Sequence, residues 1–583
     1  MLREAQAAGD ESATTGIPID EVSAMRAERR EQARANAREG LEGYNEAVER
    51  TIERGAPEDG VARDLAMTRF QAAGRGLSRR DFLKGASMTA AAAALAGSTV
   101  LRPSTASAVS QPKIVIVGGG AAGLRCANRL WTRSGWTSTI YEWDDHLGGR
   151  LETLRNYFSN GQIAEMHGEY ISSEHSATLN LASSYNLKLD DTNVVPVGVD
   201  TYWFNGSRYT QAQLDSDWSK TYWAVFNNAV KSVPWPQTYN KHSSKGVTWD
   251  KMTVPQWISA NLPGGSGTQF ARLCLEDVIS EYGGDPSDQS ALNLTFLLGY
   301  DDSAGGKGYQ PQSSPVLAGT DERWHITGGN DQLITNMYNQ VASHIGVNYG
   351  YQLVSIVKQS SGQFTCTFQV GTSTQTVTNI DRLVLALPFS TLRKVDLSKA
   401  GFTTLKMNAI NNLGYGTNSK IIVQTNGRPW NTDGYTGSMQ TDSGIDGAWE
   451  LNYQTKNYSS PTALLLAFPG GVNGAGLGAK YGLTVDEGPA PAQMVTDYLA
   501  KLEQVLPGIT AAYNGKAWYN VGPVDPHILG AWSYWRVGQY TTFSRYEGVA
   551  EGNAHFCGEH ADFNFQGFIE GAIASGERVA AEV

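Results

Sequence analysis

Three glycines and one carboxylate have the types and spacing to bind a dinucleotide. Gly118, Gly120 and Gly123 follow the apolar run Ile114–Val117 at the spacing GxGxxG, and a helix-compatible segment comes next. A β-branched run of this kind is typical of a strand buried on both faces of a parallel sheet. The glycines suit a tight turn, a close approach to a diphosphate and close packing of helix on strand. Glu142, after a second short strand, stands where an acidic residue binds a ribose hydroxyl. The diphosphate would bind the free N–H groups at the helix N-terminus.

The elements that position these residues belong to a long chain. Its 583 residues exceed one ordinary core, so we expect two intertwined domains and a leader. A hydrophobic content of 41%, with 15 Trp and 26 Tyr, fits a globular enzyme with aromatic cavities. The formal net charge of -11 argues against a nucleic-acid partner. The four cysteines have no metal-binding spacing, so no metal site is predicted.

Two further segments indicate which dinucleotide is bound. Residues 144–150 read DDHLGGR, and residues 555–578 read HFCGEHADFNFQGFIEGAIASGER. Both segments resemble FAD-binding motifs of the flavin-containing amine oxidase family, in the family's order and separated by most of the chain. The resemblance favours FAD over NAD. It implies an α/β protein in which a Rossmann-type FAD-binding domain is intertwined with an α+β substrate-binding domain.

The same resemblance implies where FAD would be held. Arg150 would neutralise phosphate charge, and Val354 would present its backbone to the adenine. Residues 164–171 (AEMHGEYI) would run beside the flavin ring. The expected cofactor-binding residues are Gly118, Gly120, Ala122, Gly123, Glu142, Gly149, Arg150, Gly168, Glu169, Val354, Gly558, Glu559, Gly567, Phe568 and Ile569.

The domain boundaries follow from the order of these motifs. We expect residues 109–174, 323–399 and 541–583 to form the FAD-binding domain, with strands at 347–357 and 382–388. The substrate-binding domain would comprise residues 175–322 and 400–540. Residues 1–77 form a charged leader that we expect to be flexible.

Residues 78–108 resemble a twin-arginine export signal. Arg79 and Arg80 lie in SRRDFLK, an alanine-rich apolar run follows, and an AxA cleavage site ends at Ala108. The apolar run is too short for a stable membrane span. The sequence therefore predicts that the twin-arginine machinery exports the protein to the periplasm or out of the cell.

Lys420 and three aromatic residues are the candidates for the chemistry. Lys420, in GTNSKIIV, resembles the family lysine that holds a water near flavin N5. Family members place the amine between two aromatic walls, which suits cation–π attraction. Phe568 would form one wall, and Trp532 or Tyr534 the other. Because Trp532 stands where monoamine oxidases carry a flavin-bound cysteine, we expect FAD to be held non-covalently.

The substrate class depends on three neighbouring residues. L-amino-acid oxidases of the family carry an arginine that clamps the substrate carboxylate, and Tyr170 stands at that position here. Glu169 beside it would repel a carboxylate and attract the second ammonium of a diamine. His167 is either a hydrogen-bonding group of the cavity or a packed side chain. Another arginine, such as Arg323, could still be brought in by the fold.

These features favour a secreted FAD-dependent amine oxidase. It would oxidise a primary amine or polyamine to an imine and then an aldehyde, while O2 is reduced to H2O2. The alternatives are an L-amino-acid oxidase, an FAD-dependent desaturase or dehydrogenase with a lipophilic substrate, and a non-catalytic flavin-binding protein. The expected partners are a small-molecule amine, O2 and the export machinery, and a homodimer is left open.

Overall fold

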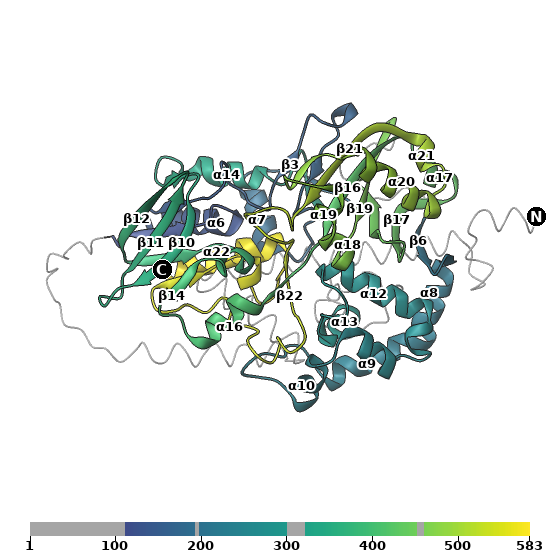
Figure 1. Cartoon of the computed structure of the whole chain (residues 1–583), viewed down its shortest axis with the longest axis horizontal. Coiled ribbons are helices and arrows are strands. Elements are labelled where there is room, and N and C mark those ends of the chain that lie inside the picture. The colour runs from purple at the N-terminus through teal and green to yellow at the C-terminus, as the bar shows by residue number, and fades with distance from the viewer. Residues whose placement is uncertain (1–110, 193–197, 300–320, 452–459) are drawn as a thin grey trace, which may run out of the picture. The chain divides into compact units, whose positions relative to one another are not determined.

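The computed structural model describes residues 111–192, 198–299, 321–451 and 460–583 (Figure 1). The predicted leader and the predicted export signal lie outside these residues. In the part of the chain that is described, no helix has the length and apolarity needed to cross a membrane. Helices and sheets alternate along the chain, so the α/β class predicted from the sequence is confirmed.

A five-stranded parallel sheet draws its strands from stretches that are far apart in the sequence. Its order is β23 (Ala554–Phe556), β13 (Arg382–Leu385), β1 (Ile114–Val117), β2 (Thr139–Tyr141) and β9 (Gly346–Asn348). Every residue of β1 is at most 3% exposed, as predicted for a strand buried on both faces. Ile114 and Ile116 pack into one apolar cluster and Val115 and Val117 into another, which is the alternation of a strand.

Helices cover one face of this sheet and a second sheet covers the other. On the helical face, α6 (Ala121–Ser134) packs against α14 (Gln332–Val341) and α22 (Ile569–Glu582). The other face meets a four-stranded sheet through apolar residues such as Ile356 and Phe368. That sheet has the order β12 (Ser373–Ile380), β11 (Phe364–Val370), β10 (Gln352–Lys358) and β14 (Asp396–Lys399).

The single strand predicted over residues 347–357 is wrong, because the structure divides it between the two sheets. β9 ends the parallel sheet and β10 lies inside the four-stranded sheet. Between them Gly350 has a φ of 75°, which glycine adopts readily. The backbone N–H of Tyr351 donates to the carbonyl of Glu142 at 2.8 Å, so the turn is fixed to the end of β2.

An eight-stranded, mostly antiparallel sheet forms the second large element. Its order is β20 (Glu487–Pro489), β21 (Tyr513–Val521), β16 (Ser419–Asn426), β19 (Thr462–Phe468), β18 (Asp446–Glu450), β17 (Tyr435–Thr441), β6 (Val199–Phe204) and β7 (Ser207–Tyr209). Along β16, Ile421 and Val423 pack with α20 (Ala492–Val505). Ile422 faces the opposite side, toward Phe158 and Met166. The side chains of Lys420 and Gln424 point to that side as well, because strand residues alternate.

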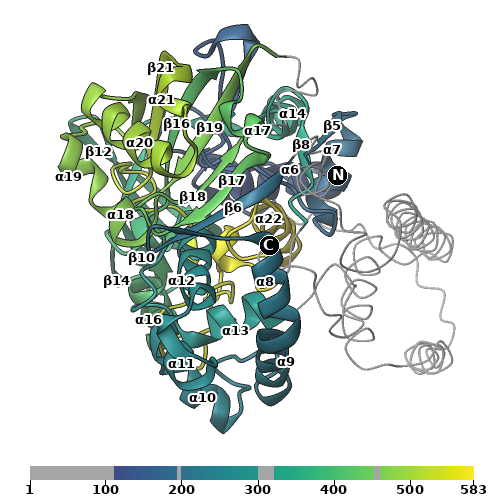
Figure 2. The ribbon, with the colours of Figure 1, turned by 90° about the vertical axis from the view of Figure 1, so that its right-hand side faces the viewer.

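Six α-helices follow β7, in the described residues up to Gly299, and pack beside this sheet (Figure 2). They are α8 (Gln211–Asp217), α9 (Trp223–Ser232), α10 (Ser244–Asp250), α11 (Val254–Asn261), α12 (Gln269–Tyr282) and α13 (Ala291–Gly299). Their core is aromatic, with Phe270 stacked on Tyr222 at 3.9 Å and packed near Phe226. α12 contacts β6, β17 and β18, and its last turn reaches the candidate site.

Short elements join these large ones. Three two-stranded ladders lie close to the site: β3 (Thr153–Leu154) with β4 (Ala164–Glu165), β5 (Leu189–Asp191) with β8 (Trp324–Ile326), and β15 (Gly414–Tyr415) with β22 (Ser533–Tyr534). The chain passes between the parallel sheet and the eight-stranded sheet several times. We therefore propose the domain division that the sequence suggested.

Candidate active site

The glycine turn predicted to bind a diphosphate joins β1 to α6. Gly118 has a φ of 100°, and a Cβ there would lie 2.6 Å from the carbonyl oxygen of Ala386. A Cβ at Gly123 would lie 2.0 Å from the carbonyl oxygen of Gly118. No side chain caps α6, which begins after Gly120. Its first N–H groups are therefore directed at the place where the diphosphate is expected.

Glu142 and the GGR loop lie against this turn. The carboxylate of Glu142 accepts hydrogen bonds from the N–H groups of Gly119 at 2.5 Å and Asp144 at 2.8 Å. The N–H of Gly148 donates to the carbonyl of Gly119 at 3.1 Å, and Gly148 forms a β-bridge with Gly120. The three parts of the predicted motif thus meet beyond the carboxyl ends of β1 and β2, where open α/β sheets bind their ligands.

Arg150 connects this loop to the C-terminal motif. Its Nη1 donates to Glu559 Oε1 at 3.0 Å and to the carbonyl of Ala531 at 2.7 Å. Glu559 also accepts from Ser533 Oγ at 2.7 Å and from the N–H of Gly567 at 2.9 Å. Burial alone would raise the pKa of Glu559, but the charge of Arg150 and these hydrogen bonds hold it below its ordinary value.

The remaining predicted cofactor residues lie along the same path. A Cβ on Gly168 would lie 3.0 Å from Ile569, so residue 168 passes against the start of α22. Phe568 is the residue before α22, and the helix has no side-chain cap there. Val354 lies at a β-bulge in the pairing of β10 with β11, which frees its backbone from the ladder. Two open helix N-termini, a guanidinium and carboxylates fit the phosphates and hydroxyls of FAD.

Lys420 is buried at the edge of this path. Its Nζ donates to the carbonyls of Glu165 at 2.8 Å and His167 at 3.1 Å, and to Glu169 Oε2 at 2.5 Å. The other carboxylate oxygen of Glu169 accepts from Trp449 Nε1 at 2.8 Å. Both oxygens of Glu169 are thus engaged within the protein. This differs from the expectation that Glu169 offers a free charge to a substrate.

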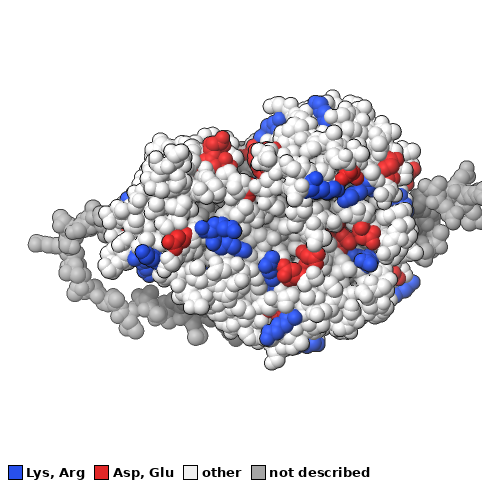
Figure 3. All heavy atoms as spheres, viewed as in Figure 1, with Lys and Arg blue, Asp and Glu red and all other residues white. Residues whose placement is uncertain are grey.

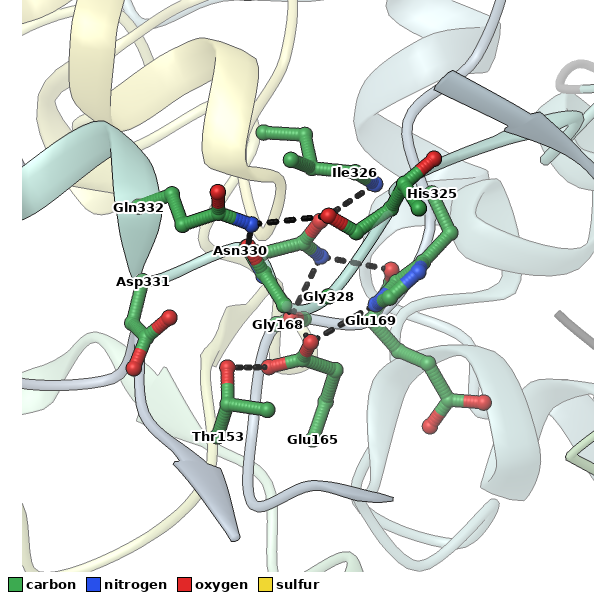
Figure 4. A network of polar contacts seen from close by, with 12 residues as sticks. Thr153, Glu165, Gly168, Glu169, His325, Ile326, Gly328, Asn330, Asp331 and Gln332 are labelled. Atoms are coloured by element: carbon green, nitrogen blue, oxygen red, sulfur yellow. Dashed lines mark hydrogen bonds and ion pairs between the residues drawn. The ribbon is translucent and has the colours of Figure 1, made fainter. Parts of the chain in front are cut away.

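The sequence reasoning missed a network on the other side of the same segment. Glu165 Oε1 lies 2.7 Å from His325 Nε2 and accepts from the N–H of Asn330 at 2.9 Å (Figure 4). Its Oε2 accepts from Thr153 Oγ1 at 2.8 Å. All four residues are buried. The available sequence signal was the GGND turn before α14. In this turn two glycines are followed by Asn330, whose amide side chain can bind backbone groups.

Trp532 stands in an aromatic cluster beside the C-terminal motif. Its ring lies parallel to Phe468, with centroids 6.0 Å apart, and a Cβ on Gly567 would lie 3.1 Å from it. Its Nε1 donates to the carbonyl of Glu281 at 2.9 Å. Trp449 and Tyr170 pack against the same cluster. Trp532 and Tyr170 thus pack against one apolar cluster, and the role of Trp532 as a cavity wall stays a prediction.

The other two aromatic candidates differ from each other. Tyr534 is 3% exposed, covers Gly284, and donates its hydroxyl to Asp288 at 2.9 Å. This enclosure argues against the predicted role of Tyr534 as a cavity wall and favours Trp532. Phe568 is only half-buried and lies edge-on to His175 at 5.2 Å, at the start of α22. Its predicted role as the second wall stays a prediction.

His167 is partly buried with Asn520 Nδ2 3.5 Å from its Nε2, and Arg323 is paired with a carboxylate. Burial lowers the pKa of His167 to about 3, and the nearby Lys420 adds to this effect. His167 is therefore neutral at physiological pH. Arg323 Nη2 donates to Asp191 at 2.7 Å, and its guanidinium lies over the ring of Trp324. Arg323 is thus already engaged by Asp191 and Trp324, which argues against a role as the carboxylate clamp.

Two carboxyl groups near this cluster were not predicted. Glu281 lies in the last turn of α12 and its carbonyl binds Trp532, and Glu322 lies just before β8. Burial raises the pKa of Glu281 to about 7. Burial and repulsion by Glu281 and Glu169 raise the pKa of Glu322 to about 8. No described residue forms a hydrogen bond or ion pair with either carboxyl, so both are available to a cation.

The fold and this site are those of an α/β oxidoreductase, and the glycine turn fits a dinucleotide. The sequence profile of flavin-containing amine oxidoreductases matches residues 121–583, so the chain belongs to this family. The predicted family and the prediction of a flavin-dependent amine oxidase are confirmed at this level. A twin-arginine signal profile matches residues 76–96. Export by that route, to the periplasm or out of the cell, is confirmed.

The similar proteins include amine and amino-acid oxidases. YobN of Bacillus subtilis (strain 168) is 26% identical, over 82% of this chain and 96% of its own. A flavin-containing amine oxidase of Danio rerio is 24% identical over 81% and 85%. An L-amino-acid oxidase of Crotalus adamanteus is 22% identical over 82% and 88%.

Solved structures show the same fold. Cyclohexylamine oxidase from Brevibacterium oxydans IH-35A has a TM-score of 0.64 at 18% identity, covering 81% of this chain and 98% of its own. A putrescine oxidase bound to putrescine has a TM-score of 0.63 at 16% identity over the same shares.

Proposed function

We propose that this protein is an exported FAD-dependent amine oxidase that acts on a primary amine or polyamine. The observation that carries the proposal is the environment of Tyr170. Tyr170 packs against the same apolar cluster as Trp449 and Trp532, and these two indoles donate to the carboxylate of Glu169 and to the backbone of Glu281. Aromatic faces and carboxylates attract a cation, whereas a substrate carboxylate would be repelled.

FAD rather than NAD is supported by the two separated motifs that meet at Arg150 and Glu559. The non-covalent attachment is supported by the cysteines. Cys126, Cys274, Cys366 and Cys557 are all buried with 0% exposure, so no thiol faces a cavity. By the resemblance to the family, Trp532 stands at the position of the cysteine that bonds the flavin in monoamine oxidases.

The overall reaction that we propose consumes an amine, water and O2. The chemistry that bound FAD would supply is a two-electron acceptor for the hydride of the carbon that bears the amine, and its reoxidation by O2 would yield H2O2. The resulting imine takes up water and gives an aldehyde and ammonia. The amine must enter this reaction as the free base, so the rate should rise as the substrate ammonium loses its proton.

The residues of this chain would orient the amine. Trp532 would form one wall, fixed by its hydrogen bond to the carbonyl of Glu281, and Phe568 the opposite wall. The second ammonium of a diamine would contact Glu281 or Glu322, because the carboxylate of Glu169 is already bound by Lys420 and Trp449. The second ammonium of a polyamine is thus assigned to these residues instead of Glu169.

The main alternative is an L-amino-acid oxidase, which some similar proteins are named as. Such an enzyme needs a cation for the α-carboxylate. The described arginines nearest the site are engaged, since Arg150 binds Glu559 and Arg323 binds Asp191. Loss of a bidentate contact between an arginine and the substrate carboxylate costs on the order of 2–5 kcal/mol, or roughly 30- to several-thousand-fold in affinity.

A peroxide-coupled assay on the FAD-loaded protein tests the proposal. Tyramine against tyrosine, and cadaverine against lysine, are pairs that differ only in the carboxylate. We expect a higher kcat/KM for each amine. An advantage of tenfold or more for both amino acids would show an L-amino-acid oxidase. If neither class yields peroxide, the protein is a dehydrogenase, a desaturase or a non-catalytic flavin-binding protein.

A further inference from the structure

We propose that Lys420 and Asn330 hold residues 165–169 from opposite sides, and that Glu169 is a positioning residue for Lys420. We call residues 165–169 the anchored segment. The proposal rests on the proposed function in one respect, because the segment is expected to lie beside the flavin. It assigns Lys420 to the position of the protein backbone rather than to a water molecule.

The hydrogen-bonding capacity of Lys420 carries the first step. A lysine ammonium has three N–H donors and no acceptor. The structure gives Nζ three acceptors: the carbonyls of Glu165 and His167 and the carboxylate of Glu169. The residue is 4% exposed. Every donor is therefore engaged, and Lys420 can hold a water near the flavin only if it gives up one of these contacts.

The second step is the role of Glu169. Its side chain is 7% exposed and bridges Lys420 to Trp449 Nε1, with contacts of 2.5 Å and 2.8 Å. In Figure 4 its carboxylate points away from Asn330. Removal of one partner from a buried ion pair leaves the other charge without compensation. Glu169 therefore fixes the ammonium of Lys420 over the anchored segment.

Asn330 grips the segment from the other side. Its Nδ2 donates to the carbonyls of Gly168 at 3.1 Å and Glu169 at 2.7 Å (Figure 4). Its Oδ1 accepts from the N–H of Ile326 at 3.0 Å, and the side chain is 0% exposed. Lys420 and Asn330 together thus bind four of the five carbonyls of the anchored segment.

The two anchors come from different parts of the fold. Lys420 lies on β16 of the eight-stranded sheet, and Asn330 lies just before α14, which packs beside the parallel sheet. Gln424 of β16 extends the same contact, since its Nε2 donates to Gln162 Oε1 at 2.6 Å. Gly168 rests on Ile569 at the start of α22, where the flavin is expected. The anchored segment therefore fixes the distance between the eight-stranded sheet and the place where the flavin is expected.

Loss of either anchor should displace the segment and slow the reaction. A misplacement of about 1 Å can cost on the order of 10²-fold in rate. We expect Asn330→Ala and Glu169→Gln each to slow flavin reduction by roughly 10²-fold, with KM changed less than about threefold. The visible absorption maxima of the bound flavin should shift. Asn128→Ala is the matched control. Asn128 is a buried amide on α6 that binds Met337 and Gln340 of α14 and does not bind the anchored segment.

A double-variant comparison separates positioning from substrate contact. If Glu169 acts through Lys420, then Lys420→Met together with Glu169→Gln should be no slower than Lys420→Met alone. If Glu169 binds substrate, Glu169→Gln should still raise KM in the Lys420→Met background. That result would overturn the role assigned to Glu169.

Hydrogen exchange tests the clamp without any activity. The N–H groups of Met166 and Gly168 donate to the carbonyls of Glu152 and Arg150, so they should exchange slowly in the purified full chain. Asn330→Ala should speed their exchange by at least about tenfold, while Asn128→Ala should not. If Asn330→Ala does not fold, Glu169→Gln serves the same measurement. Unchanged exchange in the variant would overturn the clamp, whereas a wild type without amine oxidation would overturn only the proposed function.

Discussion

Among single residues, we propose that Trp532 leaves the flavin without a covalent attachment. An indole cannot form the thioether that a cysteine forms, and the four cysteines of the chain are fully buried. We therefore predict that acid precipitation of the yellow protein releases all of its flavin into the supernatant. Flavin absorbance of both fractions measures this. Flavin fluorescence that stays with the denatured pellet would contradict the prediction.

Glu322 is predicted to recognise the second ammonium of a diamine. Its pKa is raised to about 8 by burial and by repulsion from Glu281 and Glu169, so a nearby cation should convert it to the carboxylate. A hydrogen bond to a charged group is worth about 1.5–3 kcal/mol, or roughly 10- to 100-fold. Glu322→Gln should lower kcat/KM for cadaverine by this factor.

The matched control is a monoamine of the same chain length, pentylamine. Its kcat/KM should change less than about threefold in Glu322→Gln, because it lacks the second ammonium. An equal loss for both amines would assign Glu322 a structural role instead.

The site residues that belong to local sequence motifs were predictable from the sequence. The contacts between residues that only the fold brings together were not. Gly118, Glu142 and Arg150 belong to local patterns whose geometry follows from spacing. Lys420 was found at a strand start, but its three acceptors come from residues about 250 positions away. Glu281 has no local pattern that marks it, since a carboxylate at a helix end is commonly exposed.

At the scale of elements, α12 and β18 meet through two buried carboxyl groups. Glu276 of α12 is 7% exposed, and its Oε2 has no hydrogen-bond partner in the described part of the chain. Asp446 of β18 accepts from the N–H of Gly470 and from Asn473 Nδ2, both at 2.8 Å. Burial, followed by repulsion from Asp446, raises the pKa of Glu276 well above its ordinary value of 4.5.

This contact should make the protein less stable as pH rises. Between pH 4.5 and the raised pKa, the folded protein keeps the proton of Glu276 while the unfolded chain has lost it. The folded state then binds more protons, so its stability falls with increasing pH across this window. Glu276→Gln removes the titration and keeps the shape. The difference in Tm between pH 6 and pH 9 should be smaller in the variant by at least about 1–2 °C.

Glu503→Gln provides a control with the opposite sign. Hydrogen bonds from the N–H groups of Gly508 and Thr510 lower the pKa of Glu503. Its contribution to stability is complete above pH 4.5, so this variant should lose stability equally at pH 6 and pH 9. If the Tm curves of Glu276→Gln and the wild type stay parallel over this range, the predicted linkage is absent.

The elements themselves were predicted unevenly. β1, α6 and β13 follow from apolar runs and glycine turns, and the structure places them within a few residues of the expected bounds. The strand expected over 347–357 failed, because Gly350 lets one apolar run serve two sheets. The pairing of β6 with β17 brings residues 199–204 beside residues 435–441, and nothing in either segment specifies that partner.

At the scale of the whole molecule, the surface agrees with a small-molecule enzyme. On the face shown in Figure 3, Lys and Arg side chains are interspersed with Asp and Glu instead of forming one basic patch. The net charge of -11 points the same way. The parallel sheet combines strands from residues 114–117 and 554–556, so the cofactor site is complete only when nearly the whole chain has folded.

Because the cofactor site forms only in the folded chain, it matters whether export takes place before or after folding. The twin-arginine route carries folded proteins, so FAD can be taken up in the cytoplasm before export. We predict that Arg79→Lys together with Arg80→Lys abolishes export and leaves active, FAD-loaded enzyme inside the cell, because the substitutions lie in the matched signal and outside the residues that match the oxidoreductase family. Peroxide-coupled activity and flavin fluorescence in the cellular and exported fractions measure the outcome. Arg75→Lys, just before the matched signal, keeps the same chemistry of substitution and should be exported normally. Secretion of the double variant at the normal level would show that the arginine pair does not direct export.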